Sequence, residues 1–290
     1  MRILFVTSNR LGDAVLSTGL LDHLIRSHPE ARITVVCGPA AEGVFARMPN
    51  REHTIVLRKQ PWGRHWLPLW ADVALHVWDL VVDIRGSALS WLVPTRRRAV
   101  FRRMQGPKIA QLGAILGLSP PPSPVAWIAE ADQRRASDLV PIDRPIIALA
   151  PTANWWPKVW PPDRFATACT TLTTSLIPNA IAVVLGGPGP SERAMAAPLL
   201  VALPQALDLV GTLSLPEVAA VLQRSALFIG NDSGLMHLSA AAGAPTIGLF
   251  GPTDAATYGP VGRCATAVVA ASMDGITVDQ VVEAAKTLLA

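Results

Sequence analysis

The chain has 290 residues, half of them hydrophobic, which is ample for two domains of ~145 residues and too long for one ordinary α/β layer. Its formal net charge of +4 suits an anionic substrate or an anionic membrane surface, and no recognition module for nucleic acid accompanies it, so we expect no nucleic-acid partner. Its three cysteines, Cys37, Cys169 and Cys264, show no metal-ligand spacing, so we expect free thiols in a reducing cytoplasm.

The first half alternates short apolar runs with helix-like runs, which is typical of a parallel sheet. The run at 3–7 meets polar residues too early for a signal peptide and predicts the first strand. Further strands are expected at 33–37, 54–57, 80–84 and 99–102, and helices at 13–27, 40–48, 66–76, 86–93 and 108–117. The most apolar stretch, 66–84, is interrupted by acidic residues and lacks the ~18 consecutive apolar residues of a membrane span, so we expect a soluble or at most peripheral protein.

Residues 118–145 interrupt this alternation with six prolines, so we place the interdomain linker there and expect domains at 1–143 and 144–290. A second alternating series follows. Its strands are expected at 146–150, 180–185, 226–230 and 245–250, and its helices at 162–175, 190–202, 215–223, 233–242 and 276–286. This pattern predicts two Rossmann-like α/β halves of similar size.

Residues 228–254 are the most informative segment. An apolar run ends at Gly230, the polar residues Asn231, Asp232 and Ser233 follow, and a helix-like stretch leads to a second apolar run that ends at Gly251. This order predicts a turn at the carboxyl end of a parallel strand, where open α/β sheets bind ligands. Backbone N–H groups at a helix N-terminus, beside a carboxylate and a hydroxyl, suit a ligand that carries both phosphate and sugar hydroxyls.

This segment closely resembles the C-terminal signature of glycosyltransferase family 9, the lipopolysaccharide heptosyltransferases, with Asp232-Ser233-Gly234 followed by His237 and by Leu-Phe-Gly-Pro-Thr at 249–253. The resemblance extends to Gly12-Asp13, to residues 158–161 and to residues 276–281. It implies the GT-B architecture, in which two Rossmann-like domains face each other across a cleft. It also implies a cytoplasmic inverting glycosyltransferase, peripheral on the inner membrane. The first domain would bind a lipid-linked core saccharide, and the second would bind a nucleotide-diphosphate sugar, ADP-heptose.

The polar turn at 8–13 lacks the second and third glycines of a dinucleotide fingerprint, which disfavours a hydride-transfer enzyme. From the residues alone, Gly12 permits a tight turn and Asp13 caps the first helix, a contact that is worth ~1 kcal/mol. The resemblance implies instead that Asp13 is the general base that takes the proton from the acceptor hydroxyl.

Three donor contacts are expected from loops at the start of the second half. Lys158, in a turn rich in Trp and Pro, would stabilise the diphosphate leaving group, and Thr152 would add a hydroxyl near the phosphates. Glu192, after the glycine-rich turn at 185–189, would take the ribose hydroxyls. The alternatives are a solvated loop lysine and a carboxylate that only complements the first turn of a helix.

The signature supplies four further donor contacts. Asp232 would hold sugar hydroxyls, while Ser233 and Gly234 would present N–H groups to phosphate. His237 lies on the same helix face as Gly234 and would contact the ligand, although a lone His on such a helix is more often a core residue. No DxD pair with metal spacing is present, so we expect no metal and no cofactor.

Acceptor contacts are expected from Gly12 and from basic residues of the first half. Arg58, Lys59 and Arg64 lie among tryptophans, and Arg85 follows an expected strand. A denser arginine run lies at 96–103, and five tryptophans, at 62, 66, 70, 78 and 91, lie near these charges. The alternatives are a solvated charged face and plain core packing.

Two rival functions remain open. One is a transferase that uses another nucleotide-hexose for polysaccharide synthesis. The other is a non-catalytic protein that binds nucleotide sugars, which Gly12-Asp13 argues against, because a pure binder has no use for an acceptor-side base.

Overall fold

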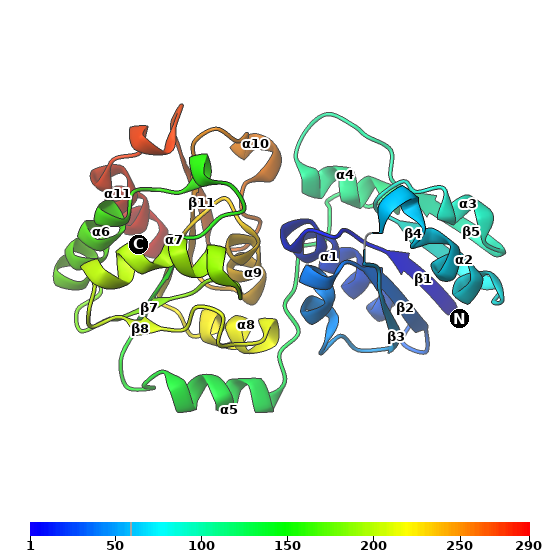
Figure 1. The fold of residues 1–290 in the computed structure, drawn as a ribbon, viewed down its shortest axis with the longest axis horizontal. Coiled ribbons are helices and arrows are strands. Elements are labelled where there is room, and N and C mark those ends of the chain that lie inside the picture. The colour runs from blue at the N-terminus through cyan, green and yellow to red at the C-terminus, as the bar shows by residue number, and fades with distance from the viewer. Residues whose placement is uncertain (59) are drawn as a thin grey trace. The chain divides into compact units, whose positions relative to one another are not determined.

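The computed structural model describes residues 1–58 and 60–290, which divide into two compact units, Met1–Trp127 and Ile128–Ala290 (Figure 1). Each unit is built on one parallel β-sheet with helices packed against it. The predicted α/β class is therefore confirmed for both halves. No helix in the described ranges is long and apolar enough to cross a membrane.

The described residues of the first unit form a five-stranded parallel sheet in the order β3-β2-β1-β4-β5. Its strands are β1 (Arg2–Val6), β2 (Arg32–Cys37), β3 (Arg51–Val56), β4 (Trp78–Asp83) and β5 (Thr95–Val100). Its helices are α1 (Leu11–Ser27), α2 (Trp66–Ala74), α3 (Leu89–Leu92) and α4 (Lys108–Ile115), with short 3-10 helices η1 (Pro39–Phe45) and η2 (Pro61–Gly63). Helix α1 packs against η1 and α4, whereas α2 packs against α3.

The second unit forms a six-stranded parallel sheet in the order β11-β10-β9-β6-β7-β8. Its strands are β6 (Ile146–Ala150), β7 (Ile181–Val184), β8 (Leu207–Asp208), β9 (Leu227–Asn231), β10 (Thr246–Phe250) and β11 (Ala265–Val269). Its helices are α5 (Glu130–Leu139), α6 (Pro162–Ser175), α7 (Pro190–Ala202), α8 (Leu215–Gln223), α9 (Gly234–Ala242), α10 (Ala255–Tyr258) and α11 (Val278–Leu289), with η3 (Trp156–Lys158) and η4 (Met273–Gly275).

Each sheet changes direction next to its first strand. From β1 the chain proceeds outward through β2 and β3, then returns to β4 on the other side of β1; from β6 it proceeds through β7 and β8, then returns to β9. The loops that follow β1 and β4, and those that follow β6 and β9, therefore diverge at a topological switch point. In open α/β sheets, ligands bind at the carboxyl ends of the strands at such a point.

The central strands have continuous apolar sequences because helices cover both faces of their sheet. Every residue of β6, β9 and β10 is buried. The second core is also locked by Trp160, which is fully buried, meets Phe165 edge-on at a ring-centroid distance of 4.9 Å and donates from Nε1 to the Ile276 carbonyl at 3.0 Å. This contact fixes the end of the loop that carries Lys158 onto the segment before α11.

The predicted boundary after residue 143 differs from the observed division because the expected linker contains helix α5. Gln133 of α5 donates to Gln223 of α8 at 3.2 Å, and Arg224 donates to the Val140 carbonyl, so the helix belongs to the second unit. Within α5 only Asp132 and Ala136 are buried. Such a polar helix shows no apolar periodicity in its sequence.

Several expected elements differ in extent. Strand β5 begins at Thr95, so arginines 96–98 lie within an edge strand rather than before one. The helix expected at 86–93 is reduced to α3, because the buried Asp83 carboxylate accepts the N–H groups of residues 85–87 and holds them in a turn. Where a helix was expected at 40–48, the structure has the 3-10 helix η1, which begins at Pro39 and ends at Phe45. Strands β8 and β11 were not anticipated.

Candidate functional site

An ion pair spans the switch point of the second sheet. Lys158, at the end of η3 in the loop after β6, places its Nζ 2.6 Å from Oδ2 of Asp232, the residue after β9. The two side chains are only 18% and 10% exposed. The structure thus joins two residues that the sequence assigned separately to one ligand, and it does not support the alternative of a solvated loop lysine.

Asn231, the last residue of β9, holds the Lys158 loop at both ends. Its Nδ2 donates to the Pro151 carbonyl at 2.8 Å, and its Oδ1 accepts the Trp160 N–H at 3.1 Å. The side chain is fully buried, so both contacts are shielded from water. Sequence reasoning missed this role, although an amide that ends a strand of otherwise apolar residues is a signal that could have revealed it.

Two buried hydroxyls lie at the carboxyl ends of neighbouring strands. Ser233 Oγ, after β9, and Thr253 Oγ1, after β10, have no hydrogen-bond partner anywhere in residues 1–58 and 60–290. Burying a polar atom without a partner is unfavourable, so both suit a polar ligand. Ser233 is the N-cap residue of α9 and makes no side-chain cap, and Gly234 opens the helix, whose first N–H groups have no intrahelical acceptor.

His237 is buried one turn into α9, which is compatible with the expected ligand contact and with its alternative, a core residue.

The loops after β6 and β7 meet at Thr152 and the glycine-rich turn. Thr152 is 3% exposed, and a Cβ added at Gly186 would lie 3.3 Å from its Cγ2. Glu192, in the first turn of α7, accepts the Gly187 N–H on Oε2 at 3.1 Å. Glu192 therefore closes the glycine-rich turn with one carboxylate oxygen, a local role that the sequence did not indicate.

In the first unit, Asp13 does not cap α1. The helix begins at Leu11 after the N-cap residue Arg10, whose N–H is bound by Ser8 Oγ at 3.1 Å. Asp13 lies in the first turn, and its Oδ2 accepts the Ser8 hydroxyl at 3.2 Å. The capping alternative is therefore wrong, and so is the tight-turn role of Gly12, which is a helical residue.

A polar contact also spans the switch point of the first sheet. Arg85, after β4, donates from Nη1 to Asn9 Oδ1 at 3.4 Å, and Asn9 follows β1. The guanidinium carbon lies 5.3 Å from the ring centroid of Trp66, the first residue of α2. A Cβ on Gly38 would lie 2.6 Å from Asn9 Cα, so only glycine leaves room for this loop after β1.

The structure gives less support to the other residues expected to bind the acceptor saccharide. Arg58 and Arg64 are exposed. Lys59 lies outside the described residues.

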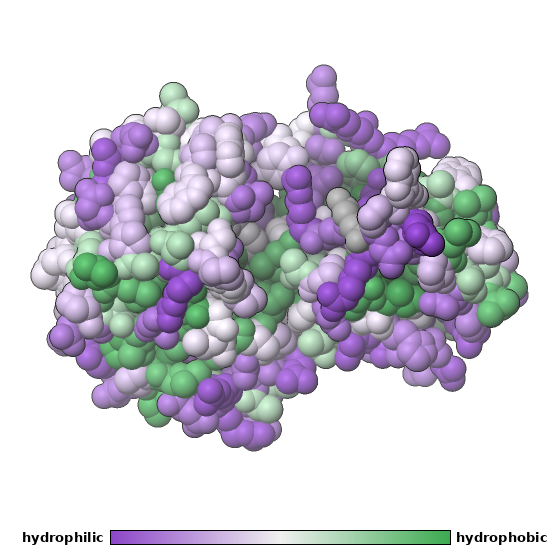
Figure 2. Space-filling model, viewed as in Figure 1, coloured by the Kyte–Doolittle hydropathy of each residue, from purple (hydrophilic) through white to green (hydrophobic). Residues whose placement is uncertain are grey.

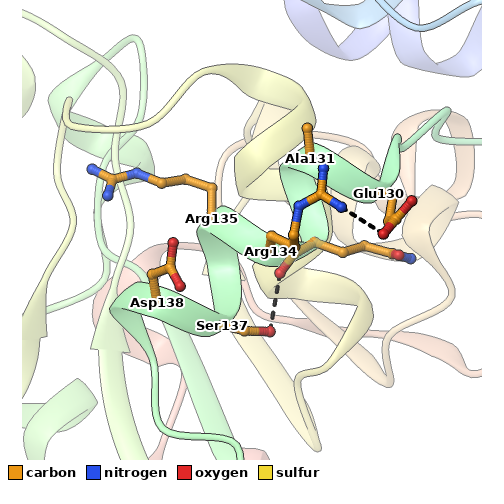
Figure 3. A pocket seen from close by; sticks show the side chains of 7 residues that line it. Glu130, Ala131, Arg134, Arg135, Ser137 and Asp138 are labelled. Carbon is orange, nitrogen blue, oxygen red and sulfur yellow. Dashed lines mark hydrogen bonds and ion pairs between the residues drawn. The ribbon is translucent and has the colours of Figure 1, made fainter.

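A shallow hollow along α5 is remote in sequence from these loops. It is lined by one helix only, with Arg134 paired to Glu130 and Ser137 donating to the backbone one turn earlier (Figure 3). It brings together none of the predicted site residues. No group of three or more His, Cys, Asp or Glu side chains within the described ranges is arranged to hold a metal ion.

The sequence profile of glycosyltransferase family 9 (heptosyltransferase) matches residues 90–285. The lipooligosaccharide heptosyltransferase 2 of Haemophilus influenzae is 26% identical over 313 residues, covering 92% of this chain and 88% of that protein. Two solved structures share the fold over nearly their whole lengths. A glycosyl transferase family 9 protein from Veillonella parvula has a TM-score of 0.82 at 23% identity, with 99% of this chain and 97% of that one covered. The Escherichia coli ADP-heptose LPS heptosyltransferase II has a TM-score of 0.80 at 21% identity, with 100% and 98% covered. The GT-B fold class is thereby confirmed.

Proposed function

Because this chain belongs to glycosyltransferase family 9, the heptosyltransferases, we propose that it moves heptose from ADP-heptose onto a lipopolysaccharide core or a related glycolipid. Relatives named for lipooligosaccharide and for ADP-heptose support this choice of substrates. With such a lipid-linked acceptor, the protein works in the cytoplasm as a peripheral protein of the inner membrane.

The observation that carries the proposal is the Lys158–Asp232 pair at the switch point of the second sheet. A lysine ammonium has three N–H donors, and the contact of 2.6 Å with Asp232 uses one. Two remain for the oxygens of a diphosphate, beside the N-terminus of α9. Asp232 keeps acceptor capacity for a sugar hydroxyl, since a carboxylate offers about four lone-pair sites.

The other residues proposed to bind the nucleotide sugar contact different parts of it. Ser233 and Gly234 present the α9 N-terminus to phosphate, Thr152 adds a hydroxyl from the neighbouring loop, and His237 contacts the ligand from α9. Glu192 binds the ribose with the carboxylate that also holds the Gly187 N–H.

In the reaction, Asp13 takes the proton from the acceptor hydroxyl while the oxygen of that hydroxyl attacks the anomeric carbon of the donor sugar. The bond from that carbon to the phosphate oxygen breaks on the opposite side, so the configuration inverts. Charge grows on the leaving ADP, where Lys158 and the α9 N-terminus stabilise it without a metal ion. Gly12 and the basic residues Arg58, Lys59, Arg64 and Arg85 bind the anionic acceptor.

Two alternatives are separated by ligand binding. A transferase that uses another nucleotide-hexose keeps this mechanism and changes only the preferred nucleotide. A non-catalytic binding protein keeps nucleotide affinity and shows no turnover with any acceptor.

The first experiment is thermal unfolding of the full chain with ADP, UDP, GDP and dTDP. A ligand at 100 times its Kd adds ~2.7 kcal/mol, which raises Tm by about 5–10 °C in a domain of this size. We expect selective stabilisation by ADP. Selective stabilisation by another nucleotide would identify that nucleotide, in place of ADP, as part of the donor. No stabilisation by any of the four would contradict a nucleotide-sugar site.

The second experiment tests the base. Asp13→Ala should keep the ADP-induced shift and lose turnover by about two orders of magnitude or more, the usual contribution of a general base. Turnover should persist in EDTA. Near-normal turnover of Asp13→Ala would remove Asp13 from the mechanism.

A further inference from the structure

One face of the first unit exposes an unusual set of large apolar side chains. They belong to η2, α2 and α3 and the residues next to them, and we call them the α2–α3 face: Trp62 (98% exposed), Leu67 (71%), Trp70 (43%), Leu75 (86%), Trp91 (63%) and Leu92 (63%). Figure 2 shows green, hydrophobic surface over α2 and α3 at the right-hand edge. Contiguous apolar surface of this kind marks an interaction site on a folded protein.

The exposed apolar side chains belong to helices that are already packed on the core by their other side. Leu69 and Val73 of α2 are buried in the core against β1 and β4, so the helix has already satisfied one apolar side. Trp70 Nε1 donates to the Leu92 carbonyl at 3.0 Å and ties α2 to α3. An ordinary surface helix turns a polar face to water, whereas the outward side of α2 carries Leu67 and Trp70, and Asp72 is its one charged residue. Trp78, expected among these tryptophans, is instead a core residue.

Positive charge borders the face. Arg98 stacks over the Trp91 ring at 5.7 Å and donates to the Ser90 carbonyl at 2.8 Å, which anchors it beside α3. Arg98 is itself exposed, as are Arg102 and Arg103 after the end of β5, and within residues 1–58 and 60–290 no ion pair involves any of the three. The partner of this border is therefore anionic.

We propose that the α2–α3 face docks on the surface of an anionic lipid bilayer. Tryptophan rings concentrate at the membrane–water interface, exposed leucines enter the acyl boundary, and arginines bind lipid phosphates. The combination of apolar centre and basic border fits a bilayer better than a protein partner, whose contact would need matching acidic groups.

The docking face leads directly to the candidate acceptor site. Trp66 starts α2, and its ring lies under the guanidinium of Arg85 at 5.3 Å. The inference rests on the proposed function to the extent that a lipid-linked acceptor reaches the first unit from the bilayer. Docking then raises the local concentration of that acceptor at the switch point of the first sheet.

The test is co-sedimentation of the full chain with vesicles of phosphatidylcholine, with and without phosphatidylglycerol. We expect binding only to the anionic vesicles and a fall in binding as salt rises. Equal binding to both vesicle types would refute the charge argument, and binding to neither would refute the inference. If the protein binds no vesicles and sediments as a dimer, and substitutions on the face make it a monomer, the face would be assigned to contact with a second copy of the chain instead.

Matched variants locate the surface. Trp62→Ser/Leu67→Ser/Leu75→Ser should lower vesicle partitioning more than ten-fold, whereas Ile142→Ser/Val201→Ser, equally apolar and exposed positions of the second unit, should leave it unchanged. Arg98→Gln/Arg102→Gln/Arg103→Gln should lower it about five-fold per arginine, and Arg135→Gln/Arg263→Gln should not. Equal losses in the face variants and their controls would overturn the assignment.

Turnover separates this inference from the proposed function. On a water-soluble, delipidated acceptor saccharide the face variants should match the wild type, and on acceptor embedded in anionic vesicles they should be slower. Turnover without vesicle binding would refute the docking face alone, and vesicle binding without turnover on any acceptor would refute the function alone.

Discussion

The Lys158–Asp232 pair allows a quantitative test of the donor site. Breaking an exposed ion pair costs ~0–1 kcal/mol, and removing one partner of a fully buried pair costs ~3–5 kcal/mol. With side chains 18% and 10% exposed, this pair lies nearer the buried limit. We therefore expect Lys158→Met to destabilise the second unit by ~2–3 kcal/mol, which lowers its Tm by about 4–12 °C.

The matched control is Lys286→Met. Lys286 makes an ion pair of similar length with Glu283, 2.7 Å, but the side chains are 50% and 68% exposed. Its loss should cost less than ~0.5 kcal/mol. The double variant Lys158→Met/Asp232→Asn should lose less than the sum of its single variants, because neither change then leaves an unpaired charge. Additive losses, or equal losses at Lys158 and Lys286, would refute the burial argument.

The same variants separate stability from ligand binding. A hydrogen bond to a charged group contributes ~1.5–3 kcal/mol, so Lys158→Met should weaken ADP binding about 10- to 100-fold by calorimetry. Asp232→Asn should bind ADP at least as well as the wild type, because the ammonium is released to the phosphates, while its turnover falls. Unchanged ADP affinity in Lys158→Met would show that the ammonium does not contact the diphosphate.

Two further predictions follow from shifted pKa values. Burial raises the pKa of the Cys37 thiol to about 12, with Glu42 adding to the shift, and burial raises the pKa of the Cys169 thiol to about 11. A thiolate-selective reagent should therefore label only the exposed Cys264 at neutral pH, and all three thiols in denaturant. Rapid labelling of Cys37 in the native protein would contradict this packing. The Arg2 backbone N–H, helped by Arg96, lowers the pKa of Asp79, so its contribution to stability is present above the unfolded pKa of about 3.9 and is lost as the pH falls through the lower folded value. Asp79→Asn should therefore unfold more easily than the wild type near pH 7 and differ less near pH 3 in urea titrations, and a constant difference would count against the shift.

The buried strands were predictable because a parallel sheet covered on both faces leaves continuous apolar runs in the sequence. Strand β6 was expected at 146–150 and is found there, and the expected strand at 226–230 differs from β9 by one residue. Edge elements were less predictable. The arginines of β5 lie in an edge strand open to solvent, and α5 contacts the second unit through few side chains. Neither carries the apolar pattern on which such predictions depend.

The contacts within the candidate site were less predictable than the strands. The resemblance placed Lys158 and Asp232 on one ligand, but they are 74 residues apart, and sequence spacing gives no distance between loops of different strands. The Asp13 contact with Ser8 was hidden because a shift of two residues in the helix start changes a cap into a first-turn side chain. The partners of Asn231 are backbone atoms of a distant loop, so the only sign of its role in the sequence is an amide at the end of an apolar strand.

The position of Asn231 also has a consequence for synthesis. Its amide joins the Pro151 carbonyl across 80 residues of chain, so a ribosome has made β6, the Lys158 loop, β7 and β8 well before the clamp can close. Until β9 emerges and pairs with β6, Lys158 has neither its carboxylate partner nor the buried amide that holds its loop. If the proposed nucleotide site is correct, a growing chain cannot bind nucleotide there until the second sheet is joined across its centre.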